Sequence, residues 1–151
     1  MKRALVLSIS LLFTALVFAQ KDYTKEADNA WKSESYFTAV DLYKKAYTKE
    51  KKKEEKIRII YRIGECYRLI ENPELAIEWY LKSEKAKYGD EDPKLYLYLA
   101  ETHRLTGKYS EAKEYYNTYK GIVPSDPKGE EGFLACEKAE KWTEKPTAYI
   151  V

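Results

Sequence analysis

The residues that could do chemistry in this chain are its two cysteines and its one histidine. Cys66 lies in "IGECYRLI" (63–70), and His103 lies in "LAETHRLT" (99–106). A cysteine nucleophile needs a base, a group that orients the base, and an oxyanion site, and no motif here supplies the last two. We therefore expect His103 to be a half-buried packing residue and Cys66 a structural thiol, and we assign no catalytic residue.

The same residues make a poor metal site. One histidine and two isolated cysteines do not have the spacing of a ligand set. Gly129 and Gly132 form only "GEEG" near the expected start of a helix, and this is not a phosphate-binding loop. The sequence predicts no metal, no cofactor and no enzymatic activity.

The two segments around Cys66 and His103 repeat each other. The small residue, the acid, the arginine and the leucine of 64–69 return in 100–105, whereas the thiol does not. A second pattern, alanine followed four residues later by tyrosine, occurs three times at nearly the same spacing: Ala39 and Tyr43, Ala76 and Tyr80, Ala112 and Tyr116. Self-similarity at this period is typical of repeat architectures in which stacked helical hairpins share one core.

The turn residues predict where the helices begin. Asn72-Pro73, Asp92-Pro93 and Asp126-Pro127 each place a capping side chain before a proline at the first helical position. We expect an all-α solenoid of three helix-turn-helix repeats, closed by a C-terminal capping helix that places Phe133, Leu134, Cys136, Ala139 and Trp142 close to one face. The expected helices are 22–32, 36–52, 54–70, 73–86, 93–105, 109–120 and 127–143.

The N-terminal segment has the pattern of a secretory signal peptide. Basic Lys2 and Arg3 precede an apolar run (4–18), and Val17-Phe18-Ala19 is a small-x-small cleavage site. We expect residues 1–19 to be removed and the mature chain to have no transmembrane helix. The remaining two cysteines, Cys66 and Cys136, would lie in different layers of the stack, so we expect no disulfide between them.

The charges of the expected mature chain balance. The whole chain has 27 Lys+Arg and 25 Asp+Glu, and removal of Lys2 and Arg3 leaves 25 of each. A neutral chain is not typical of a nucleic-acid binder. The lysine-rich run 44–56 is interrupted by Glu50, Glu54 and Glu55, which favours a solvated helical face over an anion-binding site.

The third copy, "LAETHRLTGKYSEAKEYYNTY" followed by Pro124, resembles the tetratricopeptide repeat (TPR) in its small residues, turn glycine and aromatic positions. The second copy departs from that pattern at Pro73 and Ser83. The resemblance covers about residues 21–124 and implies a right-handed TPR solenoid over 20–143. It also implies that the leading helix of each repeat lines the concave side.

A narrower resemblance involves the two ends of the chain. The signal peptide, the repeats, the Cys136-Glu137-x-Ala139-x-x-Trp142 helix and "AYIV" are similar to the N-terminal region of periplasmic OmpA-family, PorE-like proteins of Bacteroidetes. That resemblance implies a periplasmic, outer-membrane-associated protein that continues beyond Val151. Residues 144–151 would then begin a linker or a β domain, with a peptidoglycan-binding domain further on.

The resemblance to the repeat family implies a concave face that binds a protein or peptide partner. The residues expected there are Trp31, Arg58, Tyr61, Glu65, Arg68, Lys94, Leu97, Glu101 and Arg104. We expect Trp31, Tyr61, Arg68 and Arg104 to be accessible, and a second set to be buried between helices: Tyr43, Tyr67, Tyr80 and Tyr116. An alternative is that Glu65–Arg68 and Glu101–Arg104 are ion pairs that only support their own helices.

We therefore expect an exported interaction module that docks a partner at the periplasm or outer membrane, in an envelope or type IX secretion complex. The first alternative is a rigid structural spacer in a multidomain, peptidoglycan-anchored protein. A further alternative is a regulatory domain of an exported hydrolase.

Overall fold

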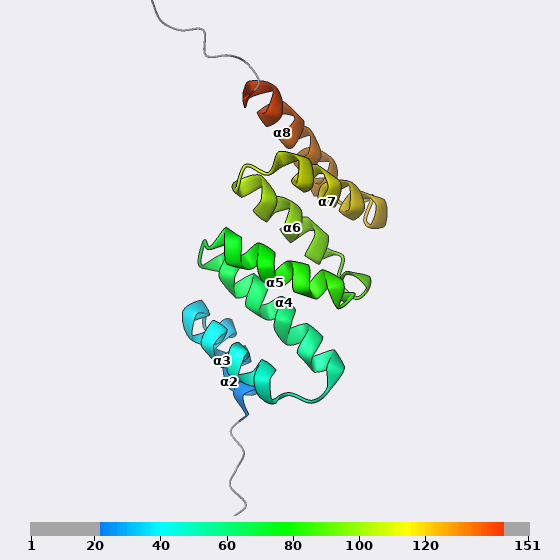
Figure 1. The fold of residues 1–151 in the computed structure, drawn as a ribbon. Coiled ribbons are helices and arrows are strands. Elements are labelled where there is room, and N and C mark those ends of the chain that lie inside the picture. The colour runs from blue at the N-terminus through cyan, green and yellow to red at the C-terminus, as the bar shows by residue number, and fades with distance from the viewer. Residues whose placement is uncertain (1–21, 144–151) are drawn as a thin grey trace, which may run out of the picture.

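The computed structural model describes residues 22–143, which form seven α-helices and one short 3-10 helix, with no strand in that range. Figure 1 shows the helices stacked in chain order from one end of the molecule to the other. Their bounds are α2 (Tyr23–Lys32), α3 (Tyr36–Lys49), α4 (Lys53–Leu69), α5 (Pro73–Lys85), η2 (Tyr88–Asp90), α6 (Lys94–Leu105), α7 (Tyr109–Ile122) and α8 (Lys128–Thr143). The expected all-α solenoid is confirmed, whereas η2 was not predicted.

The helices form two layers. Each leading helix contacts the next one in the order α2, α4, α6. For example, Arg58 of α4 forms an ion pair with Asp28 of α2 at 3.0 Å, and Arg68 of α4 lies over the Tyr98 ring of α6. The trailing helices α3, α5 and α7 also contact each other: the ring of Tyr47 lies 6.3 Å from that of Trp79, and Tyr115 donates to Glu84 at 3.0 Å. We call the surface of α2, α4 and α6 that faces away from the trailing layer the leading-helix face.

Short polar side chains begin the helices, as the sequence predicts. The Asn72 side chain accepts a hydrogen bond from the Leu75 N–H at 3.2 Å, directly before Pro73. Asp92 and Asp126 accept from the N–H two residues further on, both at 3.0 Å. Helices α6 and α8 therefore begin one residue after their proline, and the acid satisfies an amide that has no partner within the helix.

The turn inside each repeat requires one residue in the left-handed region. Glu34, Glu71 and Gly107 occupy that position, with φ of 58°, 59° and 74°. A residue with a Cβ is strained there, and only the third repeat relieves the strain with glycine. Gly107 is the turn glycine that makes the third copy the best match to the repeat pattern.

The core is built from small residues on leading helices that face tyrosines on trailing helices. A Cβ at Gly64 would lie 2.7 Å from the Tyr80 ring, so the two helices approach as closely as they do only because this residue is glycine. All four tyrosines expected between the layers are buried, with exposures from 0% to 7%: Tyr43, Tyr67, Tyr80 and Tyr116. Each of the other ten tyrosines in 22–143 is at least half-buried.

Helix α8 closes the stack, but not with all the residues that were expected. Cys136 is fully buried, Phe133 packs against the α6–α7 cluster, and Gly132 lies against the Tyr116 ring. Leu134 and Trp142 are 50% and 72% exposed, so the expectation that they share the packed face is wrong. At about 100° per residue, Leu134 lies about 160° and Trp142 about 120° around the helix from Cys136, so neither shares its face.

Two predictions fall outside the described residues: the signal peptide (1–19) and the linker or strand (144–151). Within the described range, none of the helices combines the length and apolarity that a membrane crossing requires.

Replacing Tyr80 by alanine should lower the free energy of unfolding by about 3–5 kcal/mol, because it opens a cavity against Gly64 that the helices cannot close. Tyr80→Phe keeps the ring and should cost about 1 kcal/mol through the lost hydroxyl contact. Urea unfolding measures both values. The control is Phe37→Ala, since Phe37 is 74% exposed and should change stability by less than about 0.5 kcal/mol. Equal effects of Tyr80→Ala and Phe37→Ala would contradict the packing described here.

Candidate functional site

All four arginines of the described chain lie on two leading helices. Arg58, Arg62 and Arg68 are on α4, and Arg104 is on α6, whereas the trailing helices carry lysine as their only strongly basic residue. Arginine presents a planar set of donors that binds carboxylates and stacks on aromatic rings. The leading-helix face is therefore chemically different from the rest of the surface.

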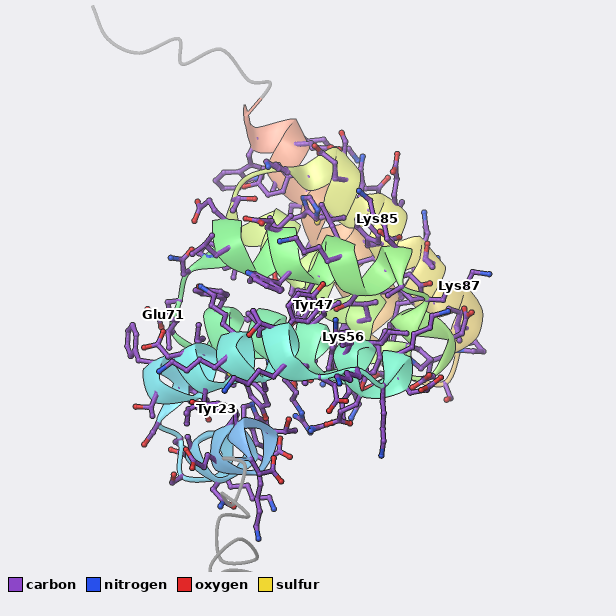
Figure 2. All side chains as sticks on the ribbon, turned by 60° about the horizontal axis from the view of Figure 1, so that its bottom comes forward. Tyr23, Tyr47, Lys56, Glu71, Lys85 and Lys87 are labelled. Atoms are coloured by element: carbon purple, nitrogen blue, oxygen red, sulfur yellow. The ribbon has the colours of Figure 1, made fainter. Side chains whose placement is uncertain are left out.

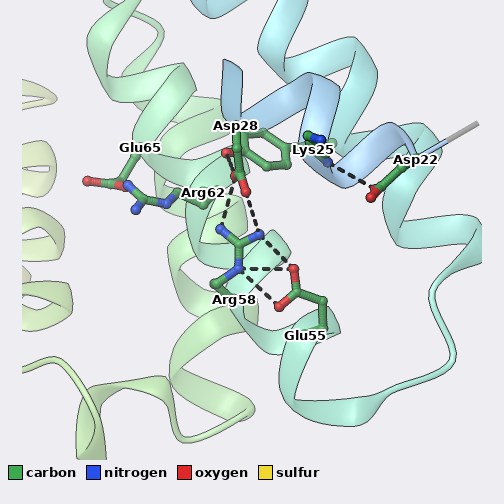
Figure 3. Close-up of polar contacts among 8 residues, drawn as sticks. Asp22, Lys25, Asp28, Glu55, Arg58, Arg62 and Glu65 are labelled. Atoms are coloured by element: carbon green, nitrogen blue, oxygen red, sulfur yellow. Dashed lines mark hydrogen bonds and ion pairs between the residues drawn. The ribbon is translucent and has the colours of Figure 1, made fainter. Parts of the chain in front are cut away.

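Arg58 of α4 joins its helix to α2 through Asp28, and it also contacts Glu55 of its own helix. Its Nη atoms donate to both Asp28 oxygens at 3.0 and 3.1 Å, and the same guanidinium contacts Glu55 at 2.6 Å (Figure 3). Tyr43 also donates to Asp28, at 2.5 Å. Burial raises the pKa of Asp28, but the hydrogen bonds from Arg58 and Tyr43 outweigh burial and hold that pKa below its usual value. Asp28 is therefore ionised and fully engaged at neutral pH.

Arg62 lies between an acid and an aromatic ring. Its Nη1 is 2.6 Å from Glu65, and its guanidinium lies 4.3 Å from the centre of the Trp31 ring. Figure 3 shows Arg62 directed toward Glu65 and away from the Arg58 cluster. Glu65 is only 7% exposed, and burial raises its pKa although Arg62 opposes the rise. The partner of Glu65 is thus Arg62, and the alternative ion pair with Arg68 is wrong.

Arg68 and Arg104 make the same contact in successive repeats. Arg68 Nε donates to the Tyr80 hydroxyl at 3.2 Å, and Arg104 Nε donates to the Tyr116 hydroxyl at 3.4 Å. Arg68 also lies over the Tyr98 ring, 4.1 Å from its centre. Neither arginine forms an ion pair with an acid among residues 22–143. The alternative pairing of Glu101 with Arg104 is therefore also wrong.

Three residues expected on the face are buried instead: Glu65, at 7% exposure, and also Tyr61 and Leu97. Tyr61 and Leu97 are each 3% exposed, so the prediction that Tyr61 is accessible is wrong. Tyr88 of η2 stacks on Tyr61 with ring centres 4.3 Å apart, and Leu97 packs into the cluster around Tyr116. The residues that remain at least partly accessible are Trp31, Arg58, Arg68, Lys94, Glu101 and Arg104.

Three residues beside this face were not predicted from the sequence. Arg62, Tyr88 and Tyr98 lie beside the expected set, in contact with Trp31, Tyr61 and Arg68 respectively. The position of Arg62, one turn after Arg58 on the same helix, was a signal that could have identified it. Tyr88 had no such signal, because its position depends on the path of the α5–α6 connection.

The lysine-rich run 44–56 does not form one helical face. Residues 50–52 lie between α3 and α4 and interrupt it. Three of its lysines lie over tyrosine rings: Lys44 over Tyr67, Lys49 over Tyr23 and Lys56 over Tyr47. Figure 2 shows the last of these pairs near the centre of the view. The rest of the run is largely exposed, which fits a solvated surface.

Two hollows in the surface of residues 22–143 bear on where a ligand could bind. One, of about 480 Å³, lies between the start of α2 and the α3–α4 connection and is lined by residues that include Tyr23, Lys49 and Lys52. The other, of about 330 Å³, lies where α4 ends, α5 begins and α6 ends. Its lining residues are Arg68, Glu71, Pro73, Thr102 and Leu105. We call it the repeat-junction pocket.

The cysteines are built into the core. Cys66 and Cys136 are both fully buried and unpaired, and they belong to two different core clusters. Burial raises the pKa of the Cys66 thiol to about 12, so it stays protonated at neutral pH and is a poor nucleophile. Within residues 22–143, no group of three or more His, Cys, Asp or Glu side chains is placed to hold a metal ion.

His103 is a packing residue, as expected. It is 6% exposed, and its ring stacks on Tyr115 with centres 5.6 Å apart. Neither ring nitrogen has a hydrogen-bond partner in the described part of the chain. Burial lowers the pKa of His103, while Glu111 opposes the shift and Lys108 adds to it. A charge on this ring would be buried without a partner, which is costly.

This environment predicts a pH-dependent stability. Because the pKa of His103 is lower in the folded chain than its usual value of about 6.5, the folded state binds fewer protons than the unfolded state. The contribution of the neutral His103 ring to the free energy of unfolding is complete above about pH 6.5. It is lost as the pH falls toward the pKa that His103 has in the folded chain. Urea unfolding at pH 7 and pH 5 should show a larger loss for the natural chain than for His103→Phe. An NMR titration that gives His103 in the folded chain a pKa at or above 6.5 would contradict the prediction.

Comparison with known proteins identifies the repeats. A family description, tetratricopeptide repeat, matches residues 57–88 and 93–124. No curated protein matches the sequence. The fold is similar to the C-terminal TPR-containing domain of a Plasmodium falciparum protein described as FK506-binding, with TM-score 0.67 and 20% identity over 82% of this chain and 90% of that one.

Two further structures have the same fold. The Sgt2 TPR domain from Aspergillus fumigatus has TM-score 0.62 and 18% identity over 85% of each chain. The Yersinia enterocolitica type III secretion chaperone SycD, in complex with a peptide of the translocator YopD, has TM-score 0.64 and 17% identity over 78% of this chain and 92% of that one. Residues 57–88 and 93–124 thus match the tetratricopeptide repeat, and the two-layered stack of helices has the fold of these solved TPR structures.

Proposed function

We propose that this protein is an exported interaction module whose leading-helix face docks a protein or peptide partner in the cell envelope. The observation that carries the proposal is the placement of all four described arginines on α4 and α6, beside Trp31 and the half-buried Tyr88 and Tyr98. Arginine, tyrosine and tryptophan are the residues most enriched at the centres of protein interfaces. No catalytic residue is part of the proposal.

Similar folds in other proteins support a peptide as the partner. SycD was solved with a peptide of YopD, and PcrH, with TM-score 0.57 and 15% identity over 77% of this chain and 90% of that one, was solved with the chaperone-binding region of PopB. At these identities the likeness is one of fold, so peptide binding by this chain rests on its own arginines and aromatic residues.

The sequence of the first nineteen residues supports the proposed cellular location. A basic start, an apolar run and a small-x-small site support export through a signal peptide. We place the mature protein in the periplasm, associated with the outer membrane, and the resemblance to PorE-like proteins supports a role in envelope assembly or type IX secretion. A peptidoglycan-binding domain further along the natural chain is part of the same proposal.

A rigid spacer is the second candidate, and one observation favours it. Each of the four arginines already contacts its own chain: Arg58 and Arg62 pair with acids, and Arg68 and Arg104 donate to tyrosine hydroxyls. In a spacer these contacts would serve only to fix one helix against the next. In an interaction module the same contacts orient the guanidinium groups before the partner arrives.

A photo-crosslinking amino acid should distinguish the two. At Glu101 or Arg104 on α6 it should capture one defined partner from cells, whereas at Glu114 or Asn117, exposed on α7, it should capture none. Arg104→Ala should weaken partner binding by at least about 1 kcal/mol, roughly fivefold, and so reduce the crosslink introduced at Glu101. The thermal midpoint should change little, because Arg104 is exposed and its contact with Tyr116 is long.

The spacer is favoured if crosslinks are equally rare from both layers. If instead α7 positions capture the partner and α6 positions do not, the partner binds the trailing layer and the proposed face is wrong.

Export predicts a specific mature mass. The protein purified from the envelope fraction should begin at Gln20, because the apolar run ends there and the chain becomes polar. Intact mass spectrometry reads this directly, and Ala19→Arg should leave the precursor uncleaved as a control. A purified protein that retains residues 1–19 would contradict the proposal.

A further inference from the structure

We propose that the repeat-junction pocket is a subsite that receives an apolar side chain of the partner with a carboxylate beside it. This inference rests on the proposed function, because it names the chemistry that the leading-helix face would recognise. It adds to that function a position, between the second and third repeats, and a chemical class, an acidic-apolar segment of a peptide.

The size and walls of the pocket fit an apolar side chain. Its volume of about 330 Å³ exceeds the roughly 150 Å³ that holds a benzene molecule in a protein interior. Leu105 is 67% exposed there, so its side chain adds accessible apolar surface to the pocket. Thr102 is fully buried, and its hydroxyl already donates to the Tyr98 carbonyl at 2.5 Å, so that donor is not available to a ligand. With Pro73 beside them, these residues offer apolar surface and few competing polar groups.

Arg68 supplies the polar part of the subsite. Its Nε is bonded to the Tyr80 hydroxyl and one side of its guanidinium is covered by Tyr98, so the group is held in place. Among residues 22–143, its two Nη groups have no hydrogen-bond partner. A half-buried guanidinium with its paired donors unsatisfied matches a carboxylate, which accepts two parallel hydrogen bonds.

The other junctions do not offer the same site. At the first junction, Trp31 stands where Arg68 stands at the second, and its ring is covered by Arg62. At the third, Arg104 makes the same tyrosine contact, but its side chain is exposed, whereas that of Arg68 is half-buried. Only the second junction combines a fixed arginine with the apolar residues Pro73 and Leu105.

Glu71 lines the repeat-junction pocket, and its charge provides a test of whether the pocket binds a carboxylate. It is exposed, in the turn between α4 and α5, and Figure 2 shows it at the edge of the molecule. Its carboxylate would repel an acidic ligand across the pocket, whereas it would not repel a neutral one. Removing this charge should therefore strengthen the binding of a carboxylate ligand.

N-acetylleucine is the minimal probe, because it joins an isobutyl group to a carboxylate. In an NMR titration of the whole mature chain it should shift the backbone amides of 68–73 and 102–106, with a dissociation constant on the order of 1 mM. N-acetylleucinamide lacks the carboxylate and should bind at least about threefold more weakly. N-acetylglycine lacks the apolar group and should cause no comparable shifts.

Variants at the exposed residues Glu71 and Leu105 keep the test independent of folding. Glu71→Gln should tighten N-acetylleucine about twofold and leave N-acetylleucinamide unchanged. Leu105→Ser should weaken both probes. Arg68→Gln should abolish the preference for the carboxylate, and the matched variant Arg104→Gln should not.

Equal affinity for N-acetylleucine and its amide would overturn the proposal, as would shifts centred elsewhere in the chain. If neither probe binds but the crosslinks from α6 remain, the subsite is wrong and the proposed function stands. If the probe binds as expected but no partner is crosslinked, the pocket has the inferred chemistry and the proposed function is wrong.

Discussion

The close approach of each leading helix to its trailing helix is the constraint on which the rest of the structure depends. At the second repeat the approach depends on Gly64, which lies against the Tyr80 ring, where even one added methyl group would clash. The same alanine-and-tyrosine spacing recurs on α3 and α7, so each hairpin is closed in the same way. Stacking these hairpins then buries a continuous core that no single hairpin could bury alone.

The tyrosines that fill this core bring hydroxyl groups with them, and these need partners when they are buried. Asp28 supplies one for Tyr43, Arg68 one for Tyr80, and Arg104 one for Tyr116. The polar residues of the leading-helix face are therefore part of the packing of the stack. This double role fixes their orientation, and it explains why they would contact a partner in a defined geometry.

The two halves of the leading-helix face differ in how far their charges are paired. Around α2 and the first half of α4, Asp28, Glu55 and Glu65 all contact Arg58 or Arg62. From Arg68 onward the arginines donate to tyrosines and leave further donors open, and the exposed Leu105 lies beside them. The proposed docking and the proposed subsite therefore fall in the second half, where binding would not have to break an existing ion pair.

The sequence by itself determined the helices and the repeat. Their boundaries follow from caps, prolines and small residues close together in the chain, which is why the expected 73–86 and 93–105 match α5 and α6 to within a residue. Only the tertiary structure decided which residues of the face are accessible. Tyr61 is covered by Tyr88, which the α5–α6 connection places there, and Glu65 pairs with Arg62 because Arg68 is held by Tyr80 from another helix. Local spacing fixes which side of a helix a residue occupies, but what covers that side depends on chain segments far away in the sequence.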